Sequence, residues 1–151
     1  MKKYIVLLLL LLLLTGCGKK KEIVSTCINT TEGDGIIVKV TDVSKYDDNY
    51  MLTYSKIVTV ESGFANYESY NNRKLEYEQL KNSFENQANY IINPDDNNRV
   101  IEVILIIDNY NLETYTESGR ENLRAKNVIR NYEFDGYKCT LDGVTREELG
   151  L

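Results

Sequence analysis

The sequence predicts a small α+β domain, and three patterns support this prediction. Residues 36–61 contain two runs in which apolar and polar residues alternate, as in half-buried strands. A later segment, which ends before Pro94, places apolar residues at helical spacing. Residues 99–107 are almost continuously apolar, as in a central strand that is buried on both faces. The expected order is β-β-α-β-α: an antiparallel hairpin and a central strand, covered by two helices.

The predicted hairpin joins residues 36–41 to residues 50–61. In the first strand Ile36, Val38 and Val40 share one side. The second strand does the same with Leu52, Tyr54, Val58 and Val60. The connection 45–49 is rich in Asp and Asn, which tolerate left-handed backbone and bond to nearby main-chain groups, so we expect a turn there.

The first predicted helix has one apolar face, formed by Tyr70, Tyr77, Leu80, Phe84, Ala88 and Ile91. We expect this face to pack in the core, although it also resembles an aromatic binding stripe. Pro94 ends the helix, because a residue before proline is disfavoured in the α region.

A second helix is predicted to begin at Ser118, which has capping-box spacing to Glu121. Its inward face comprises Ala125, Val128, Ile129 and Tyr132. Gly136 follows its end.

The first sixteen residues have the pattern of a bacterial export signal. Lys2 and Lys3 precede ten apolar residues and a small-residue segment. Ten helical residues rise only about 15 Å, half of a typical hydrocarbon core, so we expect no membrane span.

Leu14-Thr15-Gly16-Cys17 resembles the lipobox of bacterial lipoproteins. The resemblance implies that the Cys17 thiol carries diacylglycerol, that the chain is cut before Cys17, and that the new N-terminus receives an acyl chain such as palmitate. Two or more acyl chains give stable anchoring. The implied partner is therefore the cell membrane, reached through lipid from the extracytoplasmic side. An ordinary secretory signal with an incidental cysteine is the alternative.

These patterns divide the chain into four parts. Residues 1–16 are the predicted signal peptide, and residues 17–34 are the lipidated cysteine and a tether. Residues 35–139 form the predicted domain, and residues 140–151 form a C-terminal tail. In the tail, Thr145 and Glu148 have the spacing to cap a last helical turn; a disordered tail is the alternative.

Composition excludes several classes of function. Residues 1–16 contain two lysines and no acids. The rest of the chain therefore has 16 basic and 23 acidic residues, which gives a formal net charge of −7. Such an acidic chain is not expected to bind nucleic acid. The sequence has no histidine, which excludes Ser-His-Asp triads, Cys-His dyads and histidine-based zinc sites.

Two cysteines remain besides Cys17. Cys27 and Cys139 are 112 positions apart and form no CxxC motif, so we predict no zinc site. In an exported domain a disulfide is the natural prediction, and two separate buried thiols are the alternative.

The chain also resembles the YehR-like family of small bacterial lipoproteins, whose molecular function is unknown. The matching features, besides the long amphipathic helix, are Leu14-Thr15-Gly16-Cys17, Cys27, Tyr46-Asp47-Asp48-Asn49, the apolar residues 100–107, Asn131-Tyr132-Glu133 and Gly136-Tyr137-Lys138-Cys139. They cover roughly residues 1–139. The resemblance implies that the early and late cysteines pair, which favours the disulfide between Cys27 and Cys139.

Candidate chemistry is sparse. Glu102 is the one acid within the apolar run, and burial would raise its pKa if it pointed inward. We expect it instead to point outward or to form an ion pair. The oxygen-rich segments 47–49 and 95–98 lack EF-hand spacing, and turns explain both, so no metal and no cofactor other than the diacylglycerol is predicted.

The sequence therefore favours a lipid-anchored, non-enzymatic module that binds an unknown ligand or partner at the cell envelope. The alternatives are a small carboxylate-dependent hydrolase, and an inhibitor or accessory subunit that uses some of the twelve tyrosines as anchors.

Overall fold

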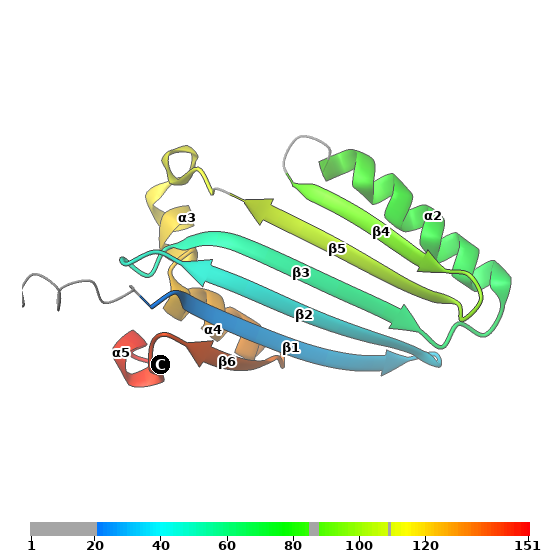
Figure 1. The fold of residues 1–151 in the computed structure, drawn as a ribbon, viewed down its shortest axis with the longest axis horizontal. Helices are drawn as coiled ribbons and strands as arrows, with labels where there is room; N and C mark the ends of the chain where they lie inside the picture. The colour runs from blue at the N-terminus through cyan, green and yellow to red at the C-terminus, as the bar shows by residue number, and fades with distance from the viewer. Residues whose placement is uncertain (1–20, 85–87, 109) are drawn as a thin grey trace, which may run out of the picture.

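The computed structural model describes residues 21–84, 88–108 and 110–151. Its centre is one antiparallel sheet with the strand order β4-β5-β3-β2-β1-β6 (Figure 1). The strands are β1 (Ile23–Gly33), β2 (Ile36–Tyr46), β3 (Leu52–Ser62), β4 (Asn89–Asp95), β5 (Val100–Asp108) and β6 (Lys138–Asp142). The α+β class is confirmed. The order β-β-α-β-α is wrong, because it omits β1, β4 and β6.

The helices gather at two ends of this sheet. They are α2 (Tyr67–Phe84), the short 3-10 helix η1 (Leu112–Thr114), α3 (Glu117–Asn122), α4 (Ala125–Phe134) and α5 (Arg146–Leu149). Figure 1 shows α2 beside β4, whereas α3, α4 and α5 lie near the end where β1 begins.

Two apolar clusters join the helices to the sheet. One contains Tyr46 and Leu52 of the sheet with Ala125, Ile129 and Leu149 of the helices. The other contains Phe64, Tyr70, Tyr90, Ile101 and Val103. Cross-strand pairing places the sheet residues of both clusters on the same face. In the described chain, all helical packing is therefore on one face, which we call the covered face.

The opposite face, which we call the open face, has no helix against it among the described residues. Ile104 and Ile106 of β5 lie on it and are only half-buried. The prediction that residues 99–107 form a strand is confirmed, with β5 paired to β3 and β4. The prediction that this strand is buried on both faces is wrong.

Large parts of the predicted tether and tail belong to the folded domain. Residues 17–34 were expected to be a tether, yet Ile23–Gly33 form β1, paired along its whole length with β2. Residues 140–151 were expected to be a tail, yet β6 continues to Asp142 and Leu149 is buried in the first cluster. The capping box of Thr145 and Glu148 is present and starts α5. The side chains of these segments are mostly polar. The segments are nevertheless ordered, because their backbone pairs with neighbouring strands and Leu149 is buried.

Both predicted helices have wrong boundaries. The first ends at Phe84, and Ile91 belongs to β4, where Pro94 occupies a sheet edge instead of ending a helix. Tyr70 and Tyr77 pack in the second cluster as expected, but Leu80 is exposed.

The second predicted helix is split into α3 and α4 at Leu123 and Arg124. The start of β3 interrupts it, because Leu52 N–H donates to the Leu123 carbonyl over 2.9 Å and Ala125 N–H donates to the Tyr50 carbonyl over 2.8 Å. The N-cap of α3 is Thr116, whose side chain accepts from Gly119 N–H.

A disulfide joins Cys27 to Cys139 and links β1 to β6, with 4.1 Å between the two Cα atoms. The predicted pairing is confirmed, and the alternative of two separate thiols is excluded. The bond closes a loop of 112 residues and fixes the C-terminal strand against the first strand.

A buried polar group lies on the covered face beside this disulfide. Asp42, opposite Cys27 in the strand register, is fully buried and accepts hydrogen bonds from the hydroxyls of Ser44 and Ser55. The hydroxyls of Ser25 and Tyr46 bond to each other over 2.9 Å. Among the described residues, every buried side-chain polar atom has a hydrogen-bond partner. The polar group is thus compatible with a stable core.

Removal of the disulfide should destabilise the domain strongly. A cross-link over 112 residues restricts the unfolded chain, and the chain-entropy model gives about 4–5 kcal/mol for a loop of this length. We expect the double variant Cys27→Ala/Cys139→Ala to lose about 3–5 kcal/mol of unfolding free energy in urea titrations. An unchanged unfolding midpoint would show that β1 and β6 pair equally well without the bond.

Alkaline pH should destabilise the fold through its buried tyrosines. Burial raises the pKa of Tyr46 and that of Tyr110 to about 12, above the ordinary value of about 10. The folded chain therefore holds protons that the unfolded chain loses, so stability is complete below about pH 10 and falls as pH rises towards 12, by up to about 1.4 kcal/mol per pH unit for each group.

Urea titrations at pH 8 and pH 11 test this expectation. The loss of unfolding free energy between pH 8 and pH 11 should be smaller in Tyr46→Phe than in the unmodified chain. Tyr67 is exposed, so Tyr67→Phe serves as the control and should show the same loss as the unmodified chain. Equal unfolding free energies at the two pH values would contradict it.

Candidate functional site

A notch lies where β6 stops and β1 continues. The strand β6 has five residues and pairs only with residues 24–28 of β1. The chain enters β6 through Gly136, whose φ of 84° belongs to the left-handed region that glycine adopts easily. This turn leads the chain away from β1. The outer edge of β1 from Asn29 to Gly33 is therefore not paired with any other described strand.

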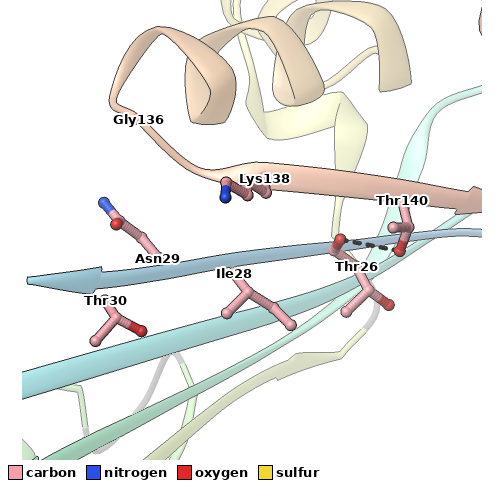
Figure 2. Close-up of a pocket in the computed structure, with 7 residues that line it drawn as sticks. All are labelled: Thr26, Ile28, Asn29, Thr30, Gly136, Lys138 and Thr140. Atoms are coloured by element: carbon pink, nitrogen blue, oxygen red, sulfur yellow. Dashed lines mark hydrogen bonds between the residues drawn. The ribbon is translucent and has the colours of Figure 1, made fainter.

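The notch forms a cavity of about 430 Å³, lined by Thr26, Ile28, Asn29, Thr30, Gly136, Lys138 and Thr140. Figure 2 shows Ile28 and Thr30 on one side of β1 and Asn29 on the other, directed towards the turn. The Asn29 amide donates to the Asp135 carbonyl over 3.3 Å, which fixes the turn to the strand. The volume lies within the range of small-ligand sites.

The notch opens onto the open face of the sheet. Strand register places apolar side chains in the middle rows of this face: Ile28, Val43, Val58, Val60, Ile91, Ile104 and Ile106. Ile28 is 39% exposed and Ile37, further along the same face, is 41% exposed. An uncovered apolar sheet surface of this kind is typical of an interaction site.

Lysines surround the apolar rows. Lys39 and Lys138 are exposed, and neither forms an ion pair with any described residue. Lys45 differs, because its ammonium lies 2.8 Å from the Glu22 carboxylate and 5.5 Å from the centre of the Tyr54 ring. Two basic side chains without ion-pair partners in the described chain, Lys39 and Lys138, therefore lie near the notch, with Glu32 on the same face.

A second cavity of about 430 Å³ lies near α3 and includes Met51, Leu112 and four charged residues. Two of those charges cancel, since Arg124 donates to Glu121 over 2.6 Å. The backbone there is also already paired, through the bridge of Met51 with Arg124. The notch is the stronger candidate of the two, because its cavity coincides with unpaired strand backbone.

The acid singled out from the sequence points outward. Glu102 lies on the open face and accepts a hydrogen bond from the Asn93 amide over 2.9 Å. The expected outward orientation is confirmed. Among the described residues, the buried acids are Asp42 and Glu61, which the sequence analysis did not identify. Continuing the alternation of Ile36, Val38 and Val40 would have placed Asp42 inward.

Glu61 connects the sheet to α2. It accepts from the Arg73 guanidinium over 2.8 Å and from the Tyr77 hydroxyl over 2.7 Å. Burial is the main cause that raises the Tyr77 pKa, and its bond to Glu61 adds to the effect. Through these two hydrogen bonds the Glu61 carboxylate holds α2 against the sheet.

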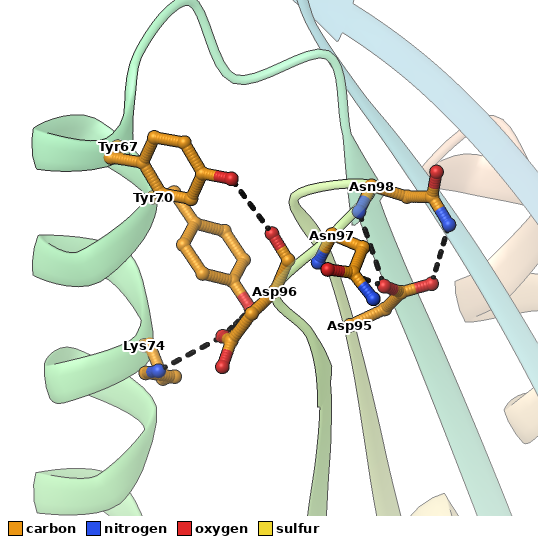
Figure 3. Close-up of polar contacts among 7 residues, drawn as sticks. All are labelled: Tyr67, Tyr70, Lys74, Asp95, Asp96, Asn97 and Asn98. Carbon is orange, nitrogen blue, oxygen red and sulfur yellow. Dashed lines mark hydrogen bonds and ion pairs between the residues drawn. The ribbon is translucent and has the colours of Figure 1, made fainter.

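The oxygen-rich segment 95–98 is a hydrogen-bonded turn, as Figure 3 shows. Asp95 accepts from the backbone of Asn97 and Asn98 over 3.1 Å. Asp96 accepts from the Tyr70 hydroxyl over 2.7 Å and from Lys74 over 3.1 Å, bonds that lower its pKa. The carboxylates thus serve the turn and its contact with α2.

The segment 47–49 behaves in the same way. The Asp47 carboxylate accepts from Asn49 N–H over 2.8 Å and from Met51 N–H over 2.9 Å. Neither turn gathers a metal site: within the described ranges no three His, Cys, Asp or Glu side chains are placed to hold an ion.

The tyrosines do not form one aromatic platform. Of those in the described chain, Tyr67 and Tyr115 are the most exposed, at 57% and 38%. Tyr67 begins α2 and Tyr115 precedes α3, and these two helices lie towards opposite ends of the sheet in Figure 1. Several others are buried or half-buried in the core.

The lipobox residues Leu14, Thr15, Gly16 and Cys17 lie outside the described residues. In the part of the chain that the structure describes, no helix is both long and apolar enough to cross a membrane.

Sequence comparison supports the anchor. Residues 1–17 match the model of the prokaryotic membrane lipoprotein lipid attachment site. Neither the curated proteins nor the solved structures include a significant match. The chain therefore carries a lipoprotein attachment site at its N-terminus, which supports anchoring to a membrane through lipid.

Proposed function

We propose that this protein is a non-enzymatic binding module, held by lipid on Cys17 at the extracytoplasmic side of the cell membrane, with the notch beside β6 as its ligand site. The observation that carries the proposal is the coincidence of a cavity, an unpaired strand edge and an uncovered sheet face at one place. The match of residues 1–17 supports the anchor.

The short connection to the anchor supports this arrangement. Only residues 18–22 separate Cys17 from the start of β1, and six residue steps span at most about 20 Å. The end of the sheet that carries Ile23 therefore stays near the bilayer. The notch lies about six residues further along β1, roughly 20 Å at 3.3 Å per residue. A ligand in the aqueous phase can reach it.

The alternatives have less support. A carboxylate-dependent hydrolase would need two acids about 5–9 Å apart, with one in a cleft. Glu102 has Asn93 and Val60 as its cross-strand neighbours, and the buried acids hold the fold together. An accessory subunit anchored by tyrosines would need exposed rings close together, and the two most exposed rings are far apart.

The YehR-like resemblance remains a prediction. Of the features on which this resemblance rests, the match of residues 1–17 includes only the lipobox.

The anchor predicts a simple change in localisation. Cys17→Ala should abolish diacylglycerol attachment and signal cleavage, and the chain should no longer incorporate labelled palmitate. The variant should keep a mass larger by its sixteen-residue signal. Cys27→Ala serves as the control, because its thiol belongs to the disulfide. Unchanged labelling and maturation of Cys17→Ala, followed by mass spectrometry, would refute the proposed anchor.

The notch predicts a ligand-dependent rise in thermal stability. A ligand at ten times its Kd stabilises the folded chain by about 1.4 kcal/mol, which raises Tm by about 5 °C in a domain of this size. We would test cell-wall sugars, muropeptides, short extended peptides and Ca²⁺ on the full chain in detergent. Thr140→Trp, which fills the notch, should abolish the shift. Thr53→Trp, at an exposed position of β3, should retain it.

Two results would contradict the proposed site. One is the absence of any shift across the panel, and the other is an equal shift in both variants.

A further inference from the structure

The free edge of β1 has a defined set of unpaired backbone groups. The 4.1 Å separation of the Cys27 and Cys139 Cα atoms is typical of a non-hydrogen-bonded antiparallel pair. The backbone of Cys27 therefore points towards β2, and that of the even-numbered residues points outward. Thr26 and Ile28 use their outward groups to pair with β6. The N–H and C=O groups of Thr30 and Glu32 point outward where no described strand lies beside them.

This edge lacks the usual protection against strand pairing. Residues 29–33 contain no proline, their register with β2 has no bulge, and Glu32 is their single charged side chain. The opposite edge of the sheet differs. It carries Pro94, which has no N–H to donate, and α2 runs beside it in Figure 1. One edge is protected and the other is available.

We propose that the notch binds an extended peptide segment of another protein, which adds as a short strand to Asn29–Gly33 of β1 in line with β6. Main-chain hydrogen bonds to Thr30 and Glu32 would provide the attachment, and the cavity would receive a side chain of the peptide. This inference rests on the proposed function and names its ligand class.

Local charge indicates the kind of peptide. A side chain opposite Thr30 on the open face lies near Lys138, which pairs with Ile28, and near Lys39, which pairs with Thr30. Neither ammonium has an ion-pair partner in the described chain. An acidic side chain at this position would complement both lysines. The peptide is therefore expected to carry Glu or Asp among β-forming residues.

A second copy of this chain fits the edge less well. Antiparallel pairing of two β1 strands about Thr31 would place residue 34 of the second copy opposite Ile28. That position is already occupied by Lys138 of β6. Because β6 closes the notch at Ile28, the free edge suits a segment of about five residues better than the β1–β2 hairpin of a second copy.

The test uses the full lipidated chain in detergent and the peptide acetyl-Thr-Val-Glu-Val-Thr-Val-amide. Amide hydrogen exchange of Thr30 and Glu32 should slow at least tenfold at saturating peptide. The amides of Asn29 and Thr31, which point towards β2, should not change. Binding without slower exchange at Thr30 and Glu32 would overturn the proposed strand addition.

Backbone-modified peptides separate strand addition from simple occupation of the cavity. N-methylation of one alternate set of peptide amides should weaken binding at least tenfold, and N-methylation of the other set should have little effect, because only one set faces β1. Equal binding of both would overturn strand addition but leave the proposed binding site intact. If no peptide binds while another ligand of the thermal panel does, the peptide class alone is wrong.

Variants of the protein give a matched comparison. Thr30→Pro removes an outward N–H without loss of a bond to β2, so it should weaken the peptide at least tenfold relative to Thr30→Val. Thermal unfolding checks that both variants fold, and Glu32→Pro replaces Thr30→Pro if that variant does not. Lys138→Ala should reduce the preference for the Glu peptide over its Gln analogue. Full affinity in a folded proline variant would refute the proposal.

Discussion

The antiparallel pairing of β1 with β6, locked by the disulfide of Cys27 with Cys139, is the constraint on which the rest of the structure depends. It joins segments 112 residues apart and makes the sheet six strands wide. With β6 fixed, α4 and α5 pack against the start of the sheet through Ile129 and Leu149. Because β6 is only five residues long, the same pairing leaves the second half of β1 free and creates the notch.

The core of the covered face is divided by polar groups. Its two apolar clusters lie at opposite ends of the sheet, and Asp42 with the buried serines lies nearer the first. A buried carboxylate is tolerated because two hydroxyls donate to it. A register slip of one residue in β2 would move Asp42 and Ser44 together to the open face and leave the Ser55 hydroxyl without its partner. The hydrogen bonds of this polar group thus favour the native register of β2 over a shifted one.

The proposed anchor would give the two ends of the sheet different surroundings. The end with the first apolar cluster follows directly from the lipid attachment segment, and the turns after β1 and β4 lie at the far end (Figure 1). The unpaired edge of β1 runs towards that far end. With the proposed anchor, one strand would provide both proximity to the membrane and access from the aqueous phase.

The sequence by itself predicted the lipid attachment site, the α+β class and the hairpin of β2 and β3, because each depends on local pattern, and it favoured the pairing of the cysteines over two separate thiols. It placed Leu52 wrongly on the side of Val58 and Val60, because a register shift near Tyr46 turns Leu52 to the covered face. It did not reveal β1, β4 or β6. Strand β1 is rich in Thr, and it is ordered by backbone bonds to two neighbours that only the fold supplies. In β4, the apolar residues continue a helical period, and pairing with β5 decides in favour of a strand. The notch is likewise a product of tertiary structure, since it arises from the unequal lengths of two strands that meet from opposite ends of the chain.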